Sequence, residues 1–285
     1  MRIRLPSGVR VFFDVGGAGL VPEGPRLREQ PTIVLIHGAE VDHAFFKPWL
    51  SPLAEVAQLV YLDLPSHGRS DLGSPGRWDL DHWADEVHAF CQLLDIEHPV
   101  VLGSSLGGRV AMVYGARHAD HPRALILVNT AAVNRLDRRM AMFGRLGGPA
   151  AAEAARRDGE EPSPAATADY HRLCMPLLVQ RPYSDDELAR LTPVRPEVFA
   201  RLVQLAHAGE DLTAVLAAIR CPVLVATGEL DPLATPDDAK DIVSHLGSDR
   251  NELVIFPGAG HGVFRDTPDA FIGAVREFLE ATATG

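Results

Sequence analysis

Short continuous runs of apolar residues recur along the chain, and most of them are rich in Val, Ile and Leu. They lie at 32–36, 59–62, 100–102, 124–128, 222–227 and 253–256. Such runs are typical of strands that are buried on both faces of a parallel sheet. Between them, apolar residues recur with the helical period, as over 80–94, 236–246 and 268–279. This alternation predicts an α/β fold in which helices cover both faces of a mostly parallel sheet.

The N-terminal region follows a different pattern. Residues 3–5 and 9–15 lie on either side of Pro6-Ser7-Gly8 and predict a β-hairpin. Residues 16–30 are rich in Gly, Pro and charge, which predicts a loop. A helix is expected over 49–57, after Pro48.

The alternation of strands and helices stops after residue 129 and resumes near residue 212. Helical segments are predicted at 138–143, 150–157, 165–179, 185–191 and 197–208, separated by Pro and Gly, and no strand is predicted there. We interpret 131–211 as a helical cap, a lid inserted over the carboxyl edge of the sheet, because an independent segment of this length is uncommon inside a compact domain. The core then comprises 1–130 and 212–285. The alternative is a separate helical domain.

The apolar run at 100–102 leads into Gly103-Ser104-Ser105-Leu106-Gly107, and a helical pattern follows. This is the G-x-S-x-G pattern of a nucleophile elbow. A strand that turns sharply into a helix strains the residue at the turn, and side chains two residues before and after it would collide. The pattern therefore predicts that Ser105 is presented at the end of a strand and that the Leu106 amide lies at a helix N-terminus, where negative charge is favoured.

An acid and a histidine follow in the order that such a nucleophile needs. Asp231 and His261 each come just after a predicted strand, and His261 lies between Gly260 and Gly262. A serine hydroxyl is a poor nucleophile unless an imidazole takes its proton, and the imidazole needs a carboxylate on its other nitrogen. The sequence therefore predicts a Ser105–His261–Asp231 triad, with Asp231 as a mere turn former before Pro232 as the alternative. The competing acids, which fit the pattern less well, are Glu229, Asp237 and Asp238.

The tetrahedral intermediate of such a reaction carries an oxyanion that backbone N–H groups stabilise. We expect the amides of Leu106 and Ala39 to supply these donors, the latter from the loop after the strand at 32–36. His37 and Gly38 are then structural, because glycine lets the backbone approach and the imidazole braces the loop. His43 and His67 are interpreted as lining or structural residues.

Composition limits the partners. The 285 residues carry a formal net charge of −11, so there is no electrostatic case for binding nucleic acid or an anionic membrane. No stretch is long enough to span a membrane, and the N-terminus lacks the apolar core of a signal peptide, which favours a cytoplasmic protein. Cys91, Cys174 and Cys221 are far apart in apolar surroundings and are expected to be reduced, buried thiols.

Several of these segments together resemble the α/β-hydrolase superfamily over nearly the whole chain, and within it the proline-iminopeptidase-like branch. The matching stretches are 35–38, 45–48, 61–63, 68–71, 83–87, the serine elbow and 258–266. The resemblance implies an α/β-hydrolase fold with a helical cap, no metal and no organic cofactor. The sequence departs from the H-G-G-P-G motif of that branch, since it has Ala, Glu and Val at 39–41. Aminopeptidases of the branch hold the substrate amino group with cap glutamates, and no motif selects one here.

These features favour a serine hydrolase that acts on a small-molecule ester or lactone through an acyl-enzyme. The alternatives are an aminopeptidase or amidase, and a member of the fold that binds a ligand or performs a non-hydrolytic rearrangement or cyclisation. Substrate identity and oligomeric state stay open. We expect most of the large cap residues to form ordinary packing between helices; they are Met140, Phe143, Tyr170, Leu173, Met175 and Leu178.

Overall fold

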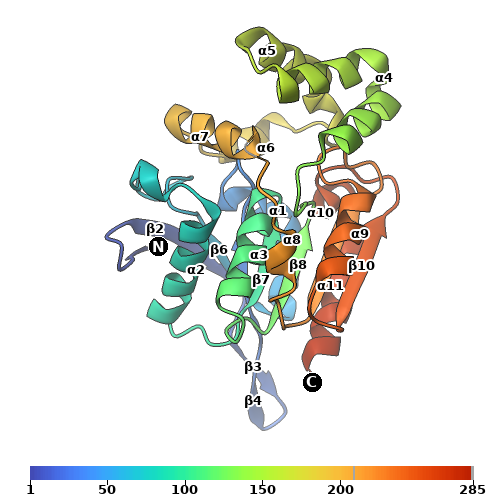
Figure 1. Cartoon of the computed structure of the whole chain (residues 1–285). Helices are drawn as coiled ribbons and strands as arrows, with labels where there is room; N and C mark the ends of the chain where they lie inside the picture. The colour runs from blue at the N-terminus through green and yellow to red at the C-terminus, as the bar shows by residue number, and fades with distance from the viewer. Residues whose placement is uncertain (208, 284–285) are drawn as a thin grey trace.

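The computed structural model describes residues 1–207 and 209–283 and contains an eight-stranded sheet (Figure 1). Its strand order is β1-β2-β6-β5-β7-β8-β9-β10. All neighbours from β6 to β10 are parallel, whereas β2 runs antiparallel to both β1 and β6. The strands are β1 (Arg2–Arg4), β2 (Arg10–Gly16), β5 (Thr32–Ile36), β6 (Gln58–Leu62), β7 (Val100–Ser104), β8 (Ala124–Val128), β9 (Val223–Gly228) and β10 (Asn251–Phe256).

Helices cover both faces of this sheet, because the central strands are apolar on both sides. In β5, Val34 and Ile36 face one layer of the core, and Ile33 and Leu35 face the other. The first layer is completed by α2 (Leu80–Leu93), α3 (Leu106–Arg117), α8 (Thr213–Leu216) and α9 (Pro236–His245). The second is completed by α1 (Lys47–Leu50), α10 (Val263–Asp266) and α11 (Pro268–Ala283). The predicted fold class is confirmed.

Two local predictions near the N-terminus are wrong. The expected loop over 16–30 contains a two-stranded hairpin of β3 (Leu20–Glu23) and β4 (Arg26–Glu29), which turns at Gly24 with a φ of 60°. The helix expected over 49–57 is limited to α1 and a 3₁₀ turn over Ser51–Glu55. Pro52 has no N–H to donate to the preceding turn, so an α-helix does not continue through it.

A group of helices, α4 to α7, lies between β8 and β9 in the chain and above the carboxyl ends of the strands in Figure 1. We call it the inserted segment. It contains α4 (Leu136–Glu160), α5 (Pro164–Leu173), α6 (Asp185–Arg190) and α7 (Pro196–His207). The two helices predicted at 138–143 and 150–157 lie within α4 on either side of a kink at Gly148, whose backbone is non-helical with a φ of 78° before Pro149. Within the described part of 131–211 there is no strand, as predicted.

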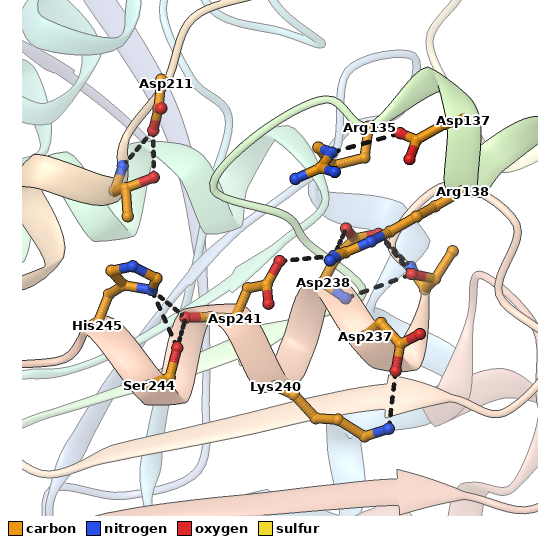
Figure 2. Close-up of polar contacts among 12 residues, drawn as sticks. Arg135, Asp137, Arg138, Asp211, Asp237, Asp238, Lys240, Asp241, Ser244 and His245 are labelled. Atoms are coloured by element: carbon orange, nitrogen blue, oxygen red, sulfur yellow. Dashed lines mark hydrogen bonds and ion pairs between the residues drawn. The ribbon is translucent and has the colours of Figure 1, made fainter.

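The inserted segment has a small core of its own and an ionic attachment to the rest of the molecule. Its buried cluster consists of Phe143, Ala151, Ala154, Ala155, Tyr170 and Cys174. Figure 2 shows Arg138 of α4 reaching two carboxylates of α9, Asp238 and Asp241, each at 2.6 Å. Asp238 also forms the capping box of α9 with Thr235. Asp238 therefore both caps the N-terminus of α9 and binds Arg138 of the inserted segment.

The three cysteines are all buried and none forms a disulfide, as predicted. Among the residues that the structure describes, no helix combines the length and apolar character needed to cross a membrane.

Candidate active site

Ser105 lies in a sharp turn between β7 and α3. Its φ of 53° and ψ of −115° place it in a strained region for a residue with a side chain. A Cβ on Gly103 would lie 2.1 Å from the carbonyl oxygen of Gly107, and one on Gly107 would lie 2.1 Å from that of Ile36. The turn therefore requires both glycines. The Ser105 amide donates to the Val128 carbonyl at 2.9 Å, which ties the turn to the neighbouring strand.

The structure brings Ser105, His261 and Asp231 together at the carboxyl edge of the sheet. His261 Nε2 lies 3.2 Å from Ser105 Oγ. His261 Nδ1 lies 2.9 Å from each carboxylate oxygen of Asp231. The Asp231 carboxylate is fully buried, whereas the His261 side chain is 14% exposed. The imidazole thus bridges a buried acid and a hydroxyl that faces a cavity.

The Asp231 carboxylate is oriented by its own turn and by a neighbouring strand. One oxygen accepts from the backbone N–H groups of Leu233 at 2.8 Å and Ala234 at 3.0 Å. The other accepts from the side-chain amide of Asn129 at 2.8 Å. The competing acids have other partners: Glu229 accepts from the Gly258 amide, Asp237 from Lys240, and Asp238 from Thr235 and Arg138.

Asn129 is a site residue that the sequence reasoning missed. Its φ of 46° is left-handed, a conformation that asparagine tolerates better than most residues. Besides its bond to Asp231, its Nδ2 donates to the Gly260 carbonyl at 3.0 Å, and its Oδ1 accepts from the Val263 amide at 3.1 Å. Asn129 therefore joins the acid to the loop over 257–262, which carries His261 and which we call the histidine loop. The available signal was its position directly after the buried run at 124–128.

The histidine loop is hydrogen-bonded to the inserted segment. The His261 amide donates to the Leu178 carbonyl at 2.6 Å, and the Gly260 amide donates to the Asp266 carboxylate at 2.8 Å. A Cβ on Gly260 would lie 2.3 Å from the same Leu178 oxygen, whereas one on Gly262 would make only ordinary contacts. Of the two glycines that flank His261, packing requires only Gly260.

The predicted oxyanion donors lie beside the nucleophile. Ala39 and Leu106 line the same cavity as Ser105 and His261. A Cβ on Gly38 would lie 3.5 Å from Ser105 Cβ, an ordinary contact, so packing around this loop does not itself demand glycine.

His37 is buried behind this loop, and burial lowers the pKa of its imidazole. Its Nε2 lies 3.1 Å from the Leu64 amide, which can only donate, so Nε2 accepts and Nδ1 carries the proton. Nδ1 then donates to the Gly38 carbonyl at 2.7 Å. A neutral His37 therefore fastens the loop to the turn after β6.

A second buried cluster lies near this loop and is structural. Asp42, His43 and Asp63 are the only described residues grouped closely enough to hold a metal ion. Protein donors already occupy their oxygens: Asp63 accepts from the ring and backbone of His43, and Asp42 accepts from the amides of Ala44 and Thr192. His67 is also buried, with Nδ1 3.1 Å from the Pro65 carbonyl. Neither His43 nor His67 lines the cavity.

A cavity of about 390 Å³ opens above Ser105 and His261. One wall comes from α7 and is apolar, with Phe199, Leu202, Val203 and Leu205. A second wall comes from α4 and α5 and is polar, with Arg139, Asp158, Thr167, Tyr170 and His171. Of the six cap residues considered from the sequence, Tyr170 alone lines the cavity, and the others belong to or pack on the core of the inserted segment.

Comparison with known proteins defines the class. Residues 31–268 match the family described as the alpha/beta hydrolase fold, and the chain therefore belongs to the α/β-hydrolase superfamily. The AB hydrolase superfamily protein YisY of Bacillus subtilis (strain 168) is 27% identical over 266 residues, which cover 86% of this chain and 90% of that protein.

Two further proteins extend this comparison. A pimeloyl-[acyl-carrier protein] methyl ester esterase of Neisseria meningitidis serogroup C is 30% identical over 257 residues, covering 87% of this chain and 93% of the esterase. The crystal structure of a Mycobacterium smegmatis proline iminopeptidase superposes with a TM-score of 0.75 at 19% identity, covering 99% of this chain and 98% of that one. Fold and relatives together identify this chain as a hydrolase of the α/β fold.

Proposed function

We propose that the protein is a serine hydrolase that cleaves a small-molecule ester or lactone through an acyl-enzyme. The observation that carries this proposal is the continuous hydrogen-bonded chain from Ser105 through His261 to Asp231 on the wall of a cavity. A hydroxyl within reach of an imidazole that a buried carboxylate orients is the arrangement that nucleophilic acyl transfer needs. The esterase among the relatives supports an ester as the substrate.

In the proposed reaction, Ser105 Oγ forms a bond to the substrate carbonyl carbon while its proton passes to His261 Nε2. The carbonyl oxygen becomes an oxyanion that accepts hydrogen bonds from the Ala39 and Leu106 amides. Collapse of this intermediate breaks the ester bond, and the departing alcohol takes the proton from His261. Water, deprotonated by the same imidazole, then releases the acid and restores Ser105.

Residues 131–211 act in this proposal as a lid, with 1–130 and 212–285 as the catalytic core. Arg265 of α10 supports this assignment, because it is buried and follows His261 closely in the chain. Its guanidinium lies 3.2 Å from the Glu187 carboxylate of α6 and donates to the Pro182 carbonyl at 2.8 Å. The lid and the histidine loop are thereby held together.

An aminopeptidase is the second candidate. The ion pairs formed by glutamates of the lid make it less favoured. Aminopeptidases of the branch that the sequence resembles hold the substrate amino group with glutamates of the cap. Five glutamates of the cap have an arginine partner: Glu153, Glu160 and Glu161 pair with Arg156, Glu187 with Arg265, and Glu210 with Arg109.

The test is covalent labelling with a fluorophosphonate together with hydrolysis of p-nitrophenyl butyrate. Wild type should be labelled and active, and Ser105→Ala should lose both labelling and at least about 10³-fold in kcat. Ser104→Ala, at the buried adjacent position, is the matched control and should keep both. A folded wild-type protein that takes no label would refute the nucleophile and favour a ligand-binding role. Release of proline from an unblocked arylamide, with esters left intact, would favour the aminopeptidase.

A further inference from the structure

Arg139 of α4 lies on the polar wall of the cavity above Ser105. Its Nη1 donates to Asn134 Oδ1 at 3.1 Å and its Nη2 to the hydroxyl of Tyr170 at 3.3 Å. Its Nε is buried without a hydrogen-bond partner among the described residues. Both partners are uncharged, and no acidic side chain of the described residues forms an ion pair with this guanidinium. The cavity wall therefore holds a fixed positive charge to which the described part of the chain supplies no contacting anion.

The Tyr170 hydroxyl adds a second hydrogen-bonding group beside the Arg139 guanidinium. Its side chain is buried in the core of the inserted segment and also lines the cavity. Because the Tyr170 oxygen accepts from Arg139, its own O–H is available to donate. A guanidinium and a hydroxyl that both offer N–H or O–H groups suit an acceptor with two oxygens, such as a carboxylate.

The rest of the cavity suits the remainder of such a ligand. The wall from α7 presents Phe199, Leu202 and Val203, which would cover an apolar chain. Asp158 lies on the polar wall, and its carboxylate accepts from Thr167 Oγ1 at 3.0 Å. Among the described residues of the α4 and α5 wall, Arg139 is the only arginine, and the acid of that wall is held by a neighbouring hydroxyl.

We propose that Arg139 and Tyr170 bind a carboxylate of the substrate, so that the preferred substrate is an ester whose acyl chain ends in a carboxylate. This inference rests on the proposed function of Ser105, and Arg139 acts in it as a specificity-determining residue. It makes no bond to the reacting atoms. The carboxylate reaches the inserted helices while the ester carbonyl lies at Ser105, and the apolar part of the chain packs against α7.

Kinetics with paired substrates test this proposal. The pairs are monomethyl esters of dicarboxylic acids, from succinate to suberate, and methyl esters of the monocarboxylic acids of the same length. Wild type should prefer one half-ester over its neutral partner. Arg139→Met should lower kcat/KM for that half-ester by about 10- to 100-fold more than for the neutral ester, the loss expected for hydrogen bonds to a charged group. Tyr170→Phe should produce a smaller loss in the same direction.

The matched control is Arg145→Met. Arg145 is on the same helix but outside the cavity, where it donates to the Glu229 carbonyl at 3.1 Å. It should leave both substrates unaffected. An equal loss for charged and neutral esters with Arg139→Met would show that Arg139 only shapes the cavity and would overturn the proposal. If Arg139→Met fails to fold, Arg139→Gln and Tyr170→Phe address the same question.

A binding measurement separates this inference from the proposed function. Ser105→Ala should bind the preferred half-ester in calorimetry, and adding Arg139→Gln should abolish that binding. Binding that depends on Arg139 in a protein that never takes a fluorophosphonate label would retain the carboxylate site and refute the hydrolase. Turnover of neutral esters without any preference for half-esters would refute the carboxylate site and retain the hydrolase.

Discussion

The glycine before the candidate base offers the sharpest test of the site geometry. In Gly260→Ala the new Cβ would lie 2.3 Å from the Leu178 carbonyl oxygen, and the His261 amide donates to that same oxygen at 2.6 Å. The new Cβ is fixed by the backbone of residue 260 and the oxygen belongs to the backbone of Leu178, so a side-chain rotation cannot relieve the clash. Relieving the clash requires a displacement of about 1 Å, and a misplacement of this size at a catalytic group costs on the order of 10²-fold in rate.

The Ser105 Oγ to His261 Nε2 distance is already 3.2 Å, near the upper limit of a useful hydrogen bond, so little displacement can be absorbed. We expect kcat for p-nitrophenyl butyrate to fall about 10²-fold and the free energy of unfolding to fall by about 1–3 kcal/mol. Gly262→Ala, where the added Cβ meets nothing closer than 3.7 Å, should stay near wild type in both measurements. A folded Gly260→Ala protein with kcat within about twofold of wild type would refute the proposed role of the loop.

Three other substitutions probe the supports of the site. Asn129→Ala removes the side-chain bonds between the acid and histidine loops and should cost about 1–3 kcal/mol in urea unfolding and lower kcat; unchanged kcat would argue against it as a positioning residue. Arg265→Met breaks the contact with Glu187 and should accelerate limited proteolysis of the inserted segment, whereas Arg172→Met, whose partner Asp169 lies on the same helix, should not. His88 stacks on His118 at 3.9 Å, and burial and its histidine neighbours lower the pKa of His88 to about 4. Because the ordinary pKa of histidine is 6.5, the folded state resists protonation of His88, and the free energy of unfolding falls as the pH drops from 6.5 to about 4. His88→Gln should flatten that part of the acid-unfolding curve. A curve identical to wild type would contradict the lowered pKa of His88.

The limits of sequence reasoning follow from the range of the interactions involved. The strands β5, β7 and β8 could be predicted because burial on both faces demands an unbroken apolar run, which one stretch of sequence displays. The hairpin of β3 and β4 was not predicted, because its four-residue strands are largely exposed and lack such a run. The break within α4 at Gly148-Pro149 could be predicted, because a glycine followed by a proline is a local signal that ends a helix.

The same distinction applies to the site. The positions of Ser105, Asp231 and His261, each after a buried run and in that order, could be predicted from the sequence, because parallel strands place their carboxyl ends at one edge. The role of Asn129 was not readable, since it depends on bonds to groups more than 100 residues away in the chain.

By itself, the sequence determined the sheet, the elbow and the three residues that could form a relay, because each depends on local pattern or local sterics. The tertiary structure alone decided that Leu178 of the inserted segment supports the histidine loop and that Arg139 faces the same cavity as Ser105. Those relations are set by how α4 and the turn after α5 pack over the sheet. Packing between distant segments depends on the shapes of both surfaces at once, and no single stretch of sequence records it.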